Sequence, residues 1–407
     1  MPNLKSAALA ASLALGLAGV AQAADLRLSA PAAGDQVPTR LSANPDTRAT
    51  ATLDRTPVAV SWALDPAANL AERPEAFVQQ SREYWLDADE AQLRRGIGLP
   101  TTAEAALIRI SPHGGNRSRL SVDDLVIRNG GVELNGRAAT QSLVDETALR
   151  AAGMDVPEGT VIARLAPAAG KGRLELAVPA ASGSYLIHVF EPTSTAVLSL
   201  TAARDTVLAG QPLRISAALQ GAKALTASGL LTAPDGYSQP FALQLQADGS
   251  WQADVVPDAA HARGPGLWEV HAFTSGGTSR APVQRDARTA FALSRPSARL
   301  DGTVASTADA GRGGLSLAVG IEAASASRYQ LAGVLYGTAA DGTRRPAAYA
   351  QSAGWLDAGN GRLTLSFDRS TLEAAKLTAP YELRDLRLSD QADLGLIERR
   401  ARAVELR

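Results

Sequence analysis

Short segments in which apolar and polar residues alternate, each closed by a turn, fill most of the chain after residue 183. Alternation with a period of two is typical of strands that bury one face. The first clear case is Gly-Ser-Tyr-Leu-Ile-His-Val at 183–189, and the densest series occupies residues 228–294. Because strands that recur every 8–12 residues or so indicate a β-sandwich, we predict an immunoglobulin-like sandwich over residues 195–295.

The last part of the chain repeats this pattern. Thr-Ala-Pro-Asp-Gly at 232–236 corresponds to Thr-Ala-Ala-Asp-Gly at 338–342, and Trp-Glu-Val at 268–270 corresponds to Tyr-Glu-Leu at 381–383. Asp-Gly pairs favour hairpin turns because both residues tolerate positive φ angles. A repeat of about 110 residues is too long for a solenoid, whose periods are about 20–50 residues. The pattern therefore predicts a second immunoglobulin-like sandwich over residues 296–407.

Residues 57–191 carry a more mixed pattern, which predicts an N-terminal α+β or β-rich domain in a mostly β protein. Asp87 and Glu90 resemble a capping pair before a short helix at 88–95, and Ser142 with Asp145 precedes a second helix at 147–152. The segment 72–80 is also expected to be helical. The strands expected in this domain are residues 58–62, 105–110, 125–127, 132–134, 173–178 and 183–189.

The first 23 residues have the pattern of a cleaved signal peptide. Lys5 supplies a positive charge, residues 7–20 form a short apolar run, and Ala-Gln-Ala at 21–23 fits a cleavage site. A membrane-spanning helix needs about 20 apolar residues, so we expect no transmembrane segment in the mature chain and a periplasmic or secreted location. Residues 24–56, rich in Pro, Ala and Thr, predict an irregular N-terminal arm, as a mobile leader or as a docking strand.

Composition narrows the classes of function further. A net charge of −1 offers no basic face for nucleic acid. The absence of cysteine excludes disulfides, thiolate nucleophiles, thiolate metal sites and a lipoprotein anchor. No Ser nucleophile elbow and no phosphate-binding loop occurs, so we expect no cofactor and assign no catalytic, cofactor-binding or metal-binding residue.

Four groups of residues are nevertheless candidates for chemistry. His113 in a Pro-His-Gly-Gly loop, with Asp123 or Asp124, is where hydrolase activity is to be sought; the remaining histidines lack a second ligand at metal spacing. The acidic cluster of Asp87, Asp89 and Glu90 is explained better by a helix N-terminus than by calcium. Arg285, Asp286 and Arg288 predict a structural ion pair at a module junction in preference to an anion site. The five tryptophans, Trp62, Trp85, Trp251, Trp268 and Trp355, favour core packing over a sugar platform.

The motifs at 232–236, 266–270 and 285–291 resemble bacterial immunoglobulin-like modules of exported proteins. Together with Ser-Arg-Glu-Tyr-Trp at 81–85 and Tyr-Glu-Leu-Arg-Asp-Leu at 381–386, they resemble the exported family named domain of unknown function 4785. This resemblance implies an N-terminal domain followed by two immunoglobulin-like domains in a gram-negative bacterium. It implies no catalytic residue.

Three functions remain open from the sequence. The first is a non-enzymatic exported protein that binds a protein or glycan of the cell envelope. The second is a hydrolase whose site lies in residues 57–191, and the third is a purely structural or adhesive element. The ligand and the oligomeric state do not follow from the sequence.

Overall fold

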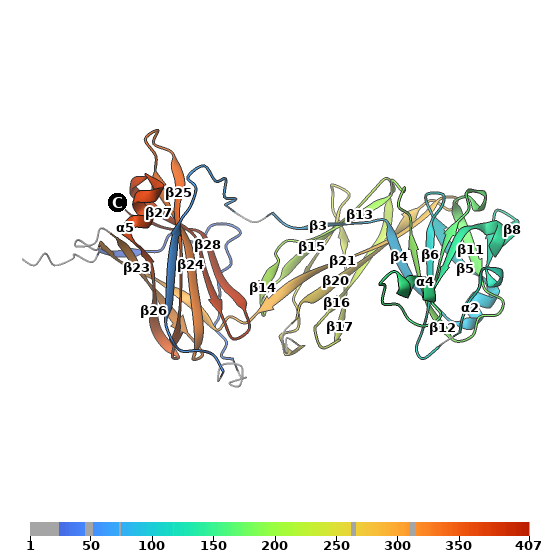
Figure 1. The fold of residues 1–407 in the computed structure, drawn as a ribbon, viewed down its shortest axis with the longest axis horizontal. Coiled ribbons are helices and arrows are strands. Elements are labelled where there is room, and N and C mark those ends of the chain that lie inside the picture. Colours follow the sequence, from blue (N-terminus) through green and yellow to red (C-terminus); the bar gives the residue numbers. More distant parts are fainter. Residues whose placement is uncertain are drawn as a thin grey trace, which may run out of the picture. The chain divides into compact units, whose positions relative to one another are not determined.

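The computed structural model describes residues 24–44, 52–72, 75–116, 118–261, 266–308 and 314–406. The predicted signal peptide at 1–23 lies outside these residues. Strands make up 56% of the chain and helices 9%, which confirms the mostly β fold class. The chain divides into two compact units, Pro74–Arg295 and a unit that combines Met1–Arg73 with Pro296–Arg407 (Figure 1).

The first part of the Pro74–Arg295 unit consists of two antiparallel sheets around one core. One contains β4, β12, β6, β10 and β9, and the other contains β5, β11, β7 and β8. Ile110 and Ile187 from the first and Leu174 and Leu176 from the second are fully buried in the same cluster. The bounds are β4 Glu83–Ala88, β5 Ile97–Thr101, β6 Leu107–His113, β7 Val126–Asn129, β8 Val132–Asn135, β9 Thr140–Asp145, β10 Val161–Leu165, β11 Gly172–Ala177, β12 Ser184–Phe190, α2 Glu90–Arg95, α3 Gly136–Ala139, α4 Glu146–Ala151, η1 Val122–Asp124 and η2 Pro167–Ala169.

The predicted helices are partly confirmed. Asp145 caps α4, because Ala148 N donates to its Oδ1 at 3.0 Å. The predicted N-cap Asp87 is wrong: it lies in β4, and Asp89 caps α2 through reciprocal bonds with Gln92. The predicted helix at 72–80 is also wrong, because Val78–Ser81 forms β3, whose backbone pairs with β13, Val197–Ala202.

The second part of this unit is a β-sandwich. The sheet β18-β19-β15-β13-β3 faces β17-β16-β20-β21, and Ile215 of the first shares a core with Trp268 and Phe291 of the second. The bounds are β13 Val197–Ala202, β14 Thr206–Leu208, β15 Leu213–Gln220, β16 Ala224–Thr232, β17 Ser238–Ala242, β18 Gln244–Leu245, β19 Trp251–Val255, η3 Ala259–His261, β20 Trp268–Gly277 and β21 Pro282–Ser294.

A buried ion pair joins the two parts of the Pro74–Arg295 unit. Arg285 Nη2 lies 2.5 Å from Glu191 Oε2, and both side chains are fully buried. Arg285 also donates to Ala196 O at 3.0 Å and to Ser194 Oγ at 2.9 Å, while Glu191 accepts from Ala103 N at 2.8 Å. A structural ion pair does lie at this junction, but the predicted pairing among Arg285, Asp286 and Arg288 is wrong, because Arg285 pairs with Glu191 and Asp286 lies beside His271.

The same junction continues one sheet from the sandwich into the N-terminal part. Strand β21 pairs with β4 at a single position, Asp286 opposite Glu83. Beyond it, the buried Asp286 carboxylate takes the place of a backbone acceptor, because Trp85 N donates to it at 3.0 Å. Its Oδ2 also lies 3.1 Å from His271 Nε2. Side-chain acceptors therefore complete the hydrogen bonds where the two strands diverge.

Glu83 gives this junction a dependence on pH. The hydrogen bond from His188 at 2.9 Å lowers the pKa of the Glu83 carboxyl below its ordinary value of 4.5. A carboxyl whose pKa is depressed by folding stabilises the protein above its unfolded pKa, and this contribution is lost as the pH falls through the folded pKa. The Glu83 side chain is 40% exposed, so solvent screening limits the effect to less than about 1 kcal/mol.

We therefore expect Glu83→Gln to flatten the decline in stability below pH 4.5. Urea denaturation at pH values between 3 and 7 measures the free energy of unfolding, with hydrogen exchange in residues 75–295 as the readout. His188→Gln should have the same effect, and the double variant should add nothing, since both remove one interaction. Additive effects of the two variants would contradict this assignment.

The C-terminal sandwich has the same strand order as the first. Its sheets are β22-β23-β26 and β25-β24-β27-β28, which correspond to β13-β15-β19 and β17-β16-β20-β21. The two Asp-Gly motifs form equivalent hairpins: Ala233 N bonds Tyr237 O, and Ala339 N bonds Thr343 O. The predicted repeat of the pattern is confirmed. The bounds are β22 Ala298–Ala308, β23 Leu315–Ala323, β24 Ser327–Thr338, β25 Arg344–Leu356, β26 Gly359–Phe367, β27 Thr378–Asp390, β28 Gly395–Leu406 and α5 Arg369–Ala375.

The N-terminal residues complete this sandwich. Strand β1, Ala24–Arg27, pairs with β22, and β2, Val58–Ala63, pairs with β25. In Figure 1 the blue β2 runs among the orange strands. The arm thus contains a docking strand, one of the two predicted alternatives. The prediction that 58–62 is a strand is confirmed, but its placement in the N-terminal domain is wrong.

Candidate functional site

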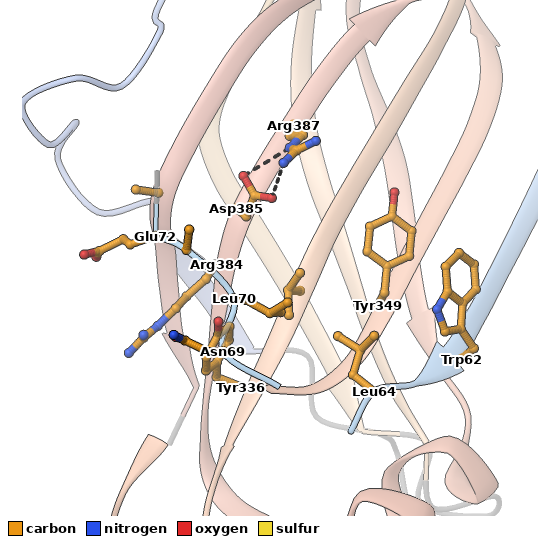
Figure 2. Close-up of a pocket in the computed structure, with 13 residues that line it drawn as sticks. Trp62, Leu64, Asn69, Leu70, Glu72, Tyr336, Tyr349, Arg384, Asp385 and Arg387 are labelled. Atoms are coloured by element: carbon orange, nitrogen blue, oxygen red, sulfur yellow. Dashed lines mark hydrogen bonds and ion pairs between the residues drawn. The ribbon is translucent and has the colours of Figure 1, made fainter. Parts of the chain in front are cut away.

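A pocket of about 380 Å³ lies on the outer face of the C-terminal sandwich. Its floor is the sheet β25-β24-β27-β28, whose opposite face carries core residues such as Leu383 and Ala350. The wall is the chain that follows β2, residues 64–72, which we call the pocket strap (Figure 2). The pocket is lined by Trp62, Leu64, Asn69, Leu70, Ala71, Glu72, Val334, Tyr336, Tyr349, Arg384, Asp385, Arg387 and Ala401.

Aromatic side chains form one side of this strap pocket. Trp62 and Tyr349 are register partners on β2 and β25, with ring centroids 4.7 Å apart and planes inclined by 35°. Trp62 is 48% exposed, whereas Tyr336 is buried. Figure 2 shows Trp62, Tyr349 and Leu64 on one side and Arg384 and Asn69 on the other. An exposed indole beside a phenol is an apolar surface open to a ligand.

The polar side chains of the pocket come from an irregularity in β27. Asp385 has φ 47°, and the pairing of β27 with β24 shifts register around it. Bulges of this kind redirect side chains. Asp385 is held by two guanidiniums: Arg399 Nε donates to its Oδ1 at 2.7 Å, and Arg387 Nη2 lies 2.6 Å from its Oδ2.

Arg384 is fixed just as firmly. Its Nε donates to Glu382 Oε2 at 2.8 Å, and its guanidinium carbon lies 4.4 Å from the centre of the Tyr336 ring. The guanidinium is therefore held by an ion pair and by a cation–π contact. The polar groups of the strap pocket are ordered before any ligand arrives.

Both ends of the pocket strap are attached to the sandwich. Leu64 N donates to Ala347 O at 3.0 Å. At the other end, Arg402 Nε donates to Glu72 Oε1 at 2.7 Å, and Arg399 Nη2 donates to Glu72 O at 3.0 Å. Arg399 thus connects the strap to Asp385, so the strap and the polar groups of the pocket support each other.

Burial raises the pKa values of Tyr336 and Tyr349 above the ordinary value of 10.0. Both phenols therefore remain protonated at neutral pH, and the Tyr349 hydroxyl donates to Gln351 Oε1 at 3.3 Å. The ion pair with Glu72 raises the pKa of Arg402. These groups suit recognition by hydrogen bonds.

The residues suggested by the sequence for hydrolysis are not brought together. His113 Nε2 lies 3.4 Å from Asp87 Oδ1. Asp123 instead forms a bidentate ion pair with Arg137. Asp124 Oδ2 accepts a hydrogen bond from Ser121 N. The predicted pairing of His113 with Asp123 or Asp124 is therefore wrong. Asp87, Asp89 and Glu90 do not form a metal site, since no group of three or more acidic or His side chains in the described ranges is placed to hold a metal ion.

The other three histidines are also paired with carboxylates. His188 lies beside Glu83, His261 beside Asp235 and His271 beside Asp286. The tryptophans divide between the core and the surface: Trp268 is buried as expected, but Trp62 opens to the strap pocket. Sequence reasoning missed Asn69 and Arg387, and quoted Arg384 and Asp385 only as part of a family motif.

A second hollow, of about 450 Å³, lies on the first sandwich. Gln244, Gln246 and Gln252 line it together with the ion pair of Arg214 and Asp254, whose side chains are 58% and 50% exposed. These exposed polar groups remain solvated, so the hollow offers less for a ligand than the strap pocket.

Among the described residues, no helix has the length and apolar character needed to cross a membrane.

Comparisons with known proteins identify a family whose models are described as domains of unknown function. The model described as the N-terminal domain of a domain of unknown function (DUF4785) matches residues 49–191, and that of the C-terminal domain matches residues 297–407. A crystal structure of a DUF4785 family protein from Legionella pneumophila is 21% identical, with a TM-score of 0.72, and the match covers 91% of this chain and 99% of that one. No curated protein matches.

Two other solved structures are similar only at low scores. The native conformation of α-2-macroglobulin from E. coli is 13% identical, with a TM-score of 0.28, over 75% of this chain and 20% of that one. A tetra-tandem repeat from the extending region of a large adhesion protein is 13% identical, with a TM-score of 0.17, over 82% and 74% of the two chains. We draw nothing about function from either.

Proposed function

Because this chain belongs to the DUF4785 family, to which no function is assigned, we propose a function from its own geometry. It is an exported, non-enzymatic binding protein of the cell envelope, and it holds part of a protein or glycan partner in the strap pocket. The leader pattern at residues 1–23 supports export, to the periplasm or to the outside of the cell.

One observation carries this proposal: an exposed indole lines the same pocket as polar groups that are already fixed. Trp62 is 48% exposed in a pocket whose Arg384 and Asp385 are held by other side chains. Large apolar side chains are normally buried, so an exposed one in a concave site points to a ligand. Polar groups that are held before binding lose little entropy when the ligand arrives.

The test is retention of material from the cell envelope by the immobilised mature chain. We expect Trp62→Ala to reduce retention by about tenfold or more, because an aromatic anchor at the centre of a site carries much of the binding energy. Trp355→Ala is the matched control: Trp355 lies on β25 outside the pocket and donates to Asp357. Equal retention by both variants would contradict the proposal, as would retention of nothing by the unaltered chain.

A further inference from the structure

The charges that line the strap pocket balance each other. Arg384 and Arg387 are the two basic side chains of the lining, and Glu72 and Asp385 are the two acidic ones. Each is engaged in an ion pair with a neighbour, with N–O distances of 2.5–2.7 Å. A charged ligand would have to displace one of these partners, whereas an uncharged ligand would not.

The remaining hydrogen-bonding capacity of these groups suits hydroxyls. A guanidinium carries five N–H donors and a carboxylate accepts at about four positions. Arg384 directs two nitrogens at one oxygen of Glu382, and the Asp385 carboxylate is 25% exposed. Donors and acceptors that are planar and fixed match hydroxyls, each of which both donates and accepts.

The aromatic side of the pocket requires an apolar face on the same ligand. Trp62 and Tyr349 lie side by side, and the Trp62 ring is nearly half exposed. A pyranose ring has a face of C–H groups that stacks on an indole, while its hydroxyls project from the rim. An aliphatic peptide side chain would cover the indole but would offer no hydroxyl to the remaining N–H groups of Arg384 or to the 25% exposed carboxylate of Asp385.

We propose that the strap pocket binds a neutral saccharide, with one pyranose ring stacked on Trp62 and hydroxyls farther along the saccharide bonded to Asp385 and Arg384. This inference rests on the proposed function and specifies its ligand class. The ring can belong to an envelope polysaccharide or to a free sugar, and the two sources share this chemistry. The pocket volume of about 380 Å³ lies within the usual range for small-molecule sites, about 300–1,000 Å³.

Calorimetric titration of the full mature chain tests the ligand class. The probes are methyl glycosides of glucose, galactose, mannose and N-acetylglucosamine, and neutral hexasaccharides of the same sugars. Binding of the methyl glycosides identifies a single ring as sufficient, and binding of the hexasaccharides alone identifies a polysaccharide as the source. Hydrophobic dipeptides and glucuronic acid are the competing ligands, and preference for either overturns the inference.

Variants locate the binding. Trp62→Ala and Asp385→Asn should each weaken saccharide binding by about tenfold, and Trp355→Ala should leave it unchanged. Asparagine tolerates the positive φ of residue 385, and thermal unfolding verifies its fold. If that variant does not fold, Arg387→Gln at the 48% exposed Arg387 replaces it.

The two proposals fail in distinguishable ways. If Trp62→Ala reduces the retention of envelope material but no neutral saccharide binds, the ligand class is wrong and the binding function stands. If a saccharide binds equally well to Trp62→Ala, the site is wrong. If neither envelope material nor saccharide binds, both proposals are wrong.

Discussion

Replacement of Arg285 by alanine is expected to lower the free energy of unfolding of the Pro74–Arg295 unit by about 3–5 kcal/mol. Arg285 and Glu191 are both fully buried, 2.5 Å apart. Removal of one charge leaves the other without a counter-ion in a medium that solvates it poorly. It also leaves Ala196 O and Ser194 Oγ without the donor that Arg285 supplies.

This loss is measured by urea denaturation of the full chain, with hydrogen exchange in peptides from residues 75–295 as the readout. The matched control is Arg288→Ala. Arg288 lies on the same strand, but it is 51% exposed and 3.6 Å from Glu269, so its loss should cost less than about 1 kcal/mol. Similar effects of the two variants would show that the buried pair does not hold the junction.

Replacement of Trp268 by alanine is expected to destabilise the first sandwich by about 3–5 kcal/mol. Trp268 is 1% exposed and begins β20, where its ring lies 6.4 Å from that of Phe291. Truncation removes a large buried apolar surface and leaves a cavity that both sheets line. Differential scanning calorimetry and hydrogen exchange at β20 and β21 measure the loss.

Trp268→Phe separates packing from hydrogen bonding. Within the described residues, the buried Nε1 of Trp268 has no hydrogen-bond partner, so phenylalanine removes no bond and keeps most of the apolar volume. We expect it to cost much less than alanine. A phenylalanine variant as unstable as the alanine variant would mean that the indole nitrogen contributes through a bond.

Local chemistry explains which predictions from the sequence are confirmed. The Asp-Gly turns at 235–236 and 341–342 form hairpins because Asp and Gly favour the backbone conformation of a tight turn. This preference depends only on residues within the turn itself. Asp145 caps its helix for the same reason. The capping residue of α2 is Asp89 rather than Asp87, two residues away, because two acids competed for one role and the pairing of β4 with β12 includes Asp87.

Predictions failed where partners distant in sequence decide the structure. Residues 78–81 have a helical composition, but hydrogen bonds to β13 make them a strand. Residues 58–63 were correctly predicted as a strand, but their alternation contains nothing that identifies β25 as the partner. The assignment of this strand to the nearest domain followed chain order alone.

The mostly β class, the repeated pattern of strands and turns and the family could be predicted from the sequence, because period-two alternation, turn residues and local motifs are properties of neighbouring residues. The strap pocket, and the pairing of Arg285 with Glu191, follow only from tertiary contacts. The aromatic pair of the pocket, Trp62 with Tyr349, and its anchor, Glu72 with Arg402, join residues about 300 positions apart. Such contacts form only when the N-terminal strand docks on the last sandwich, and no local preference encodes them.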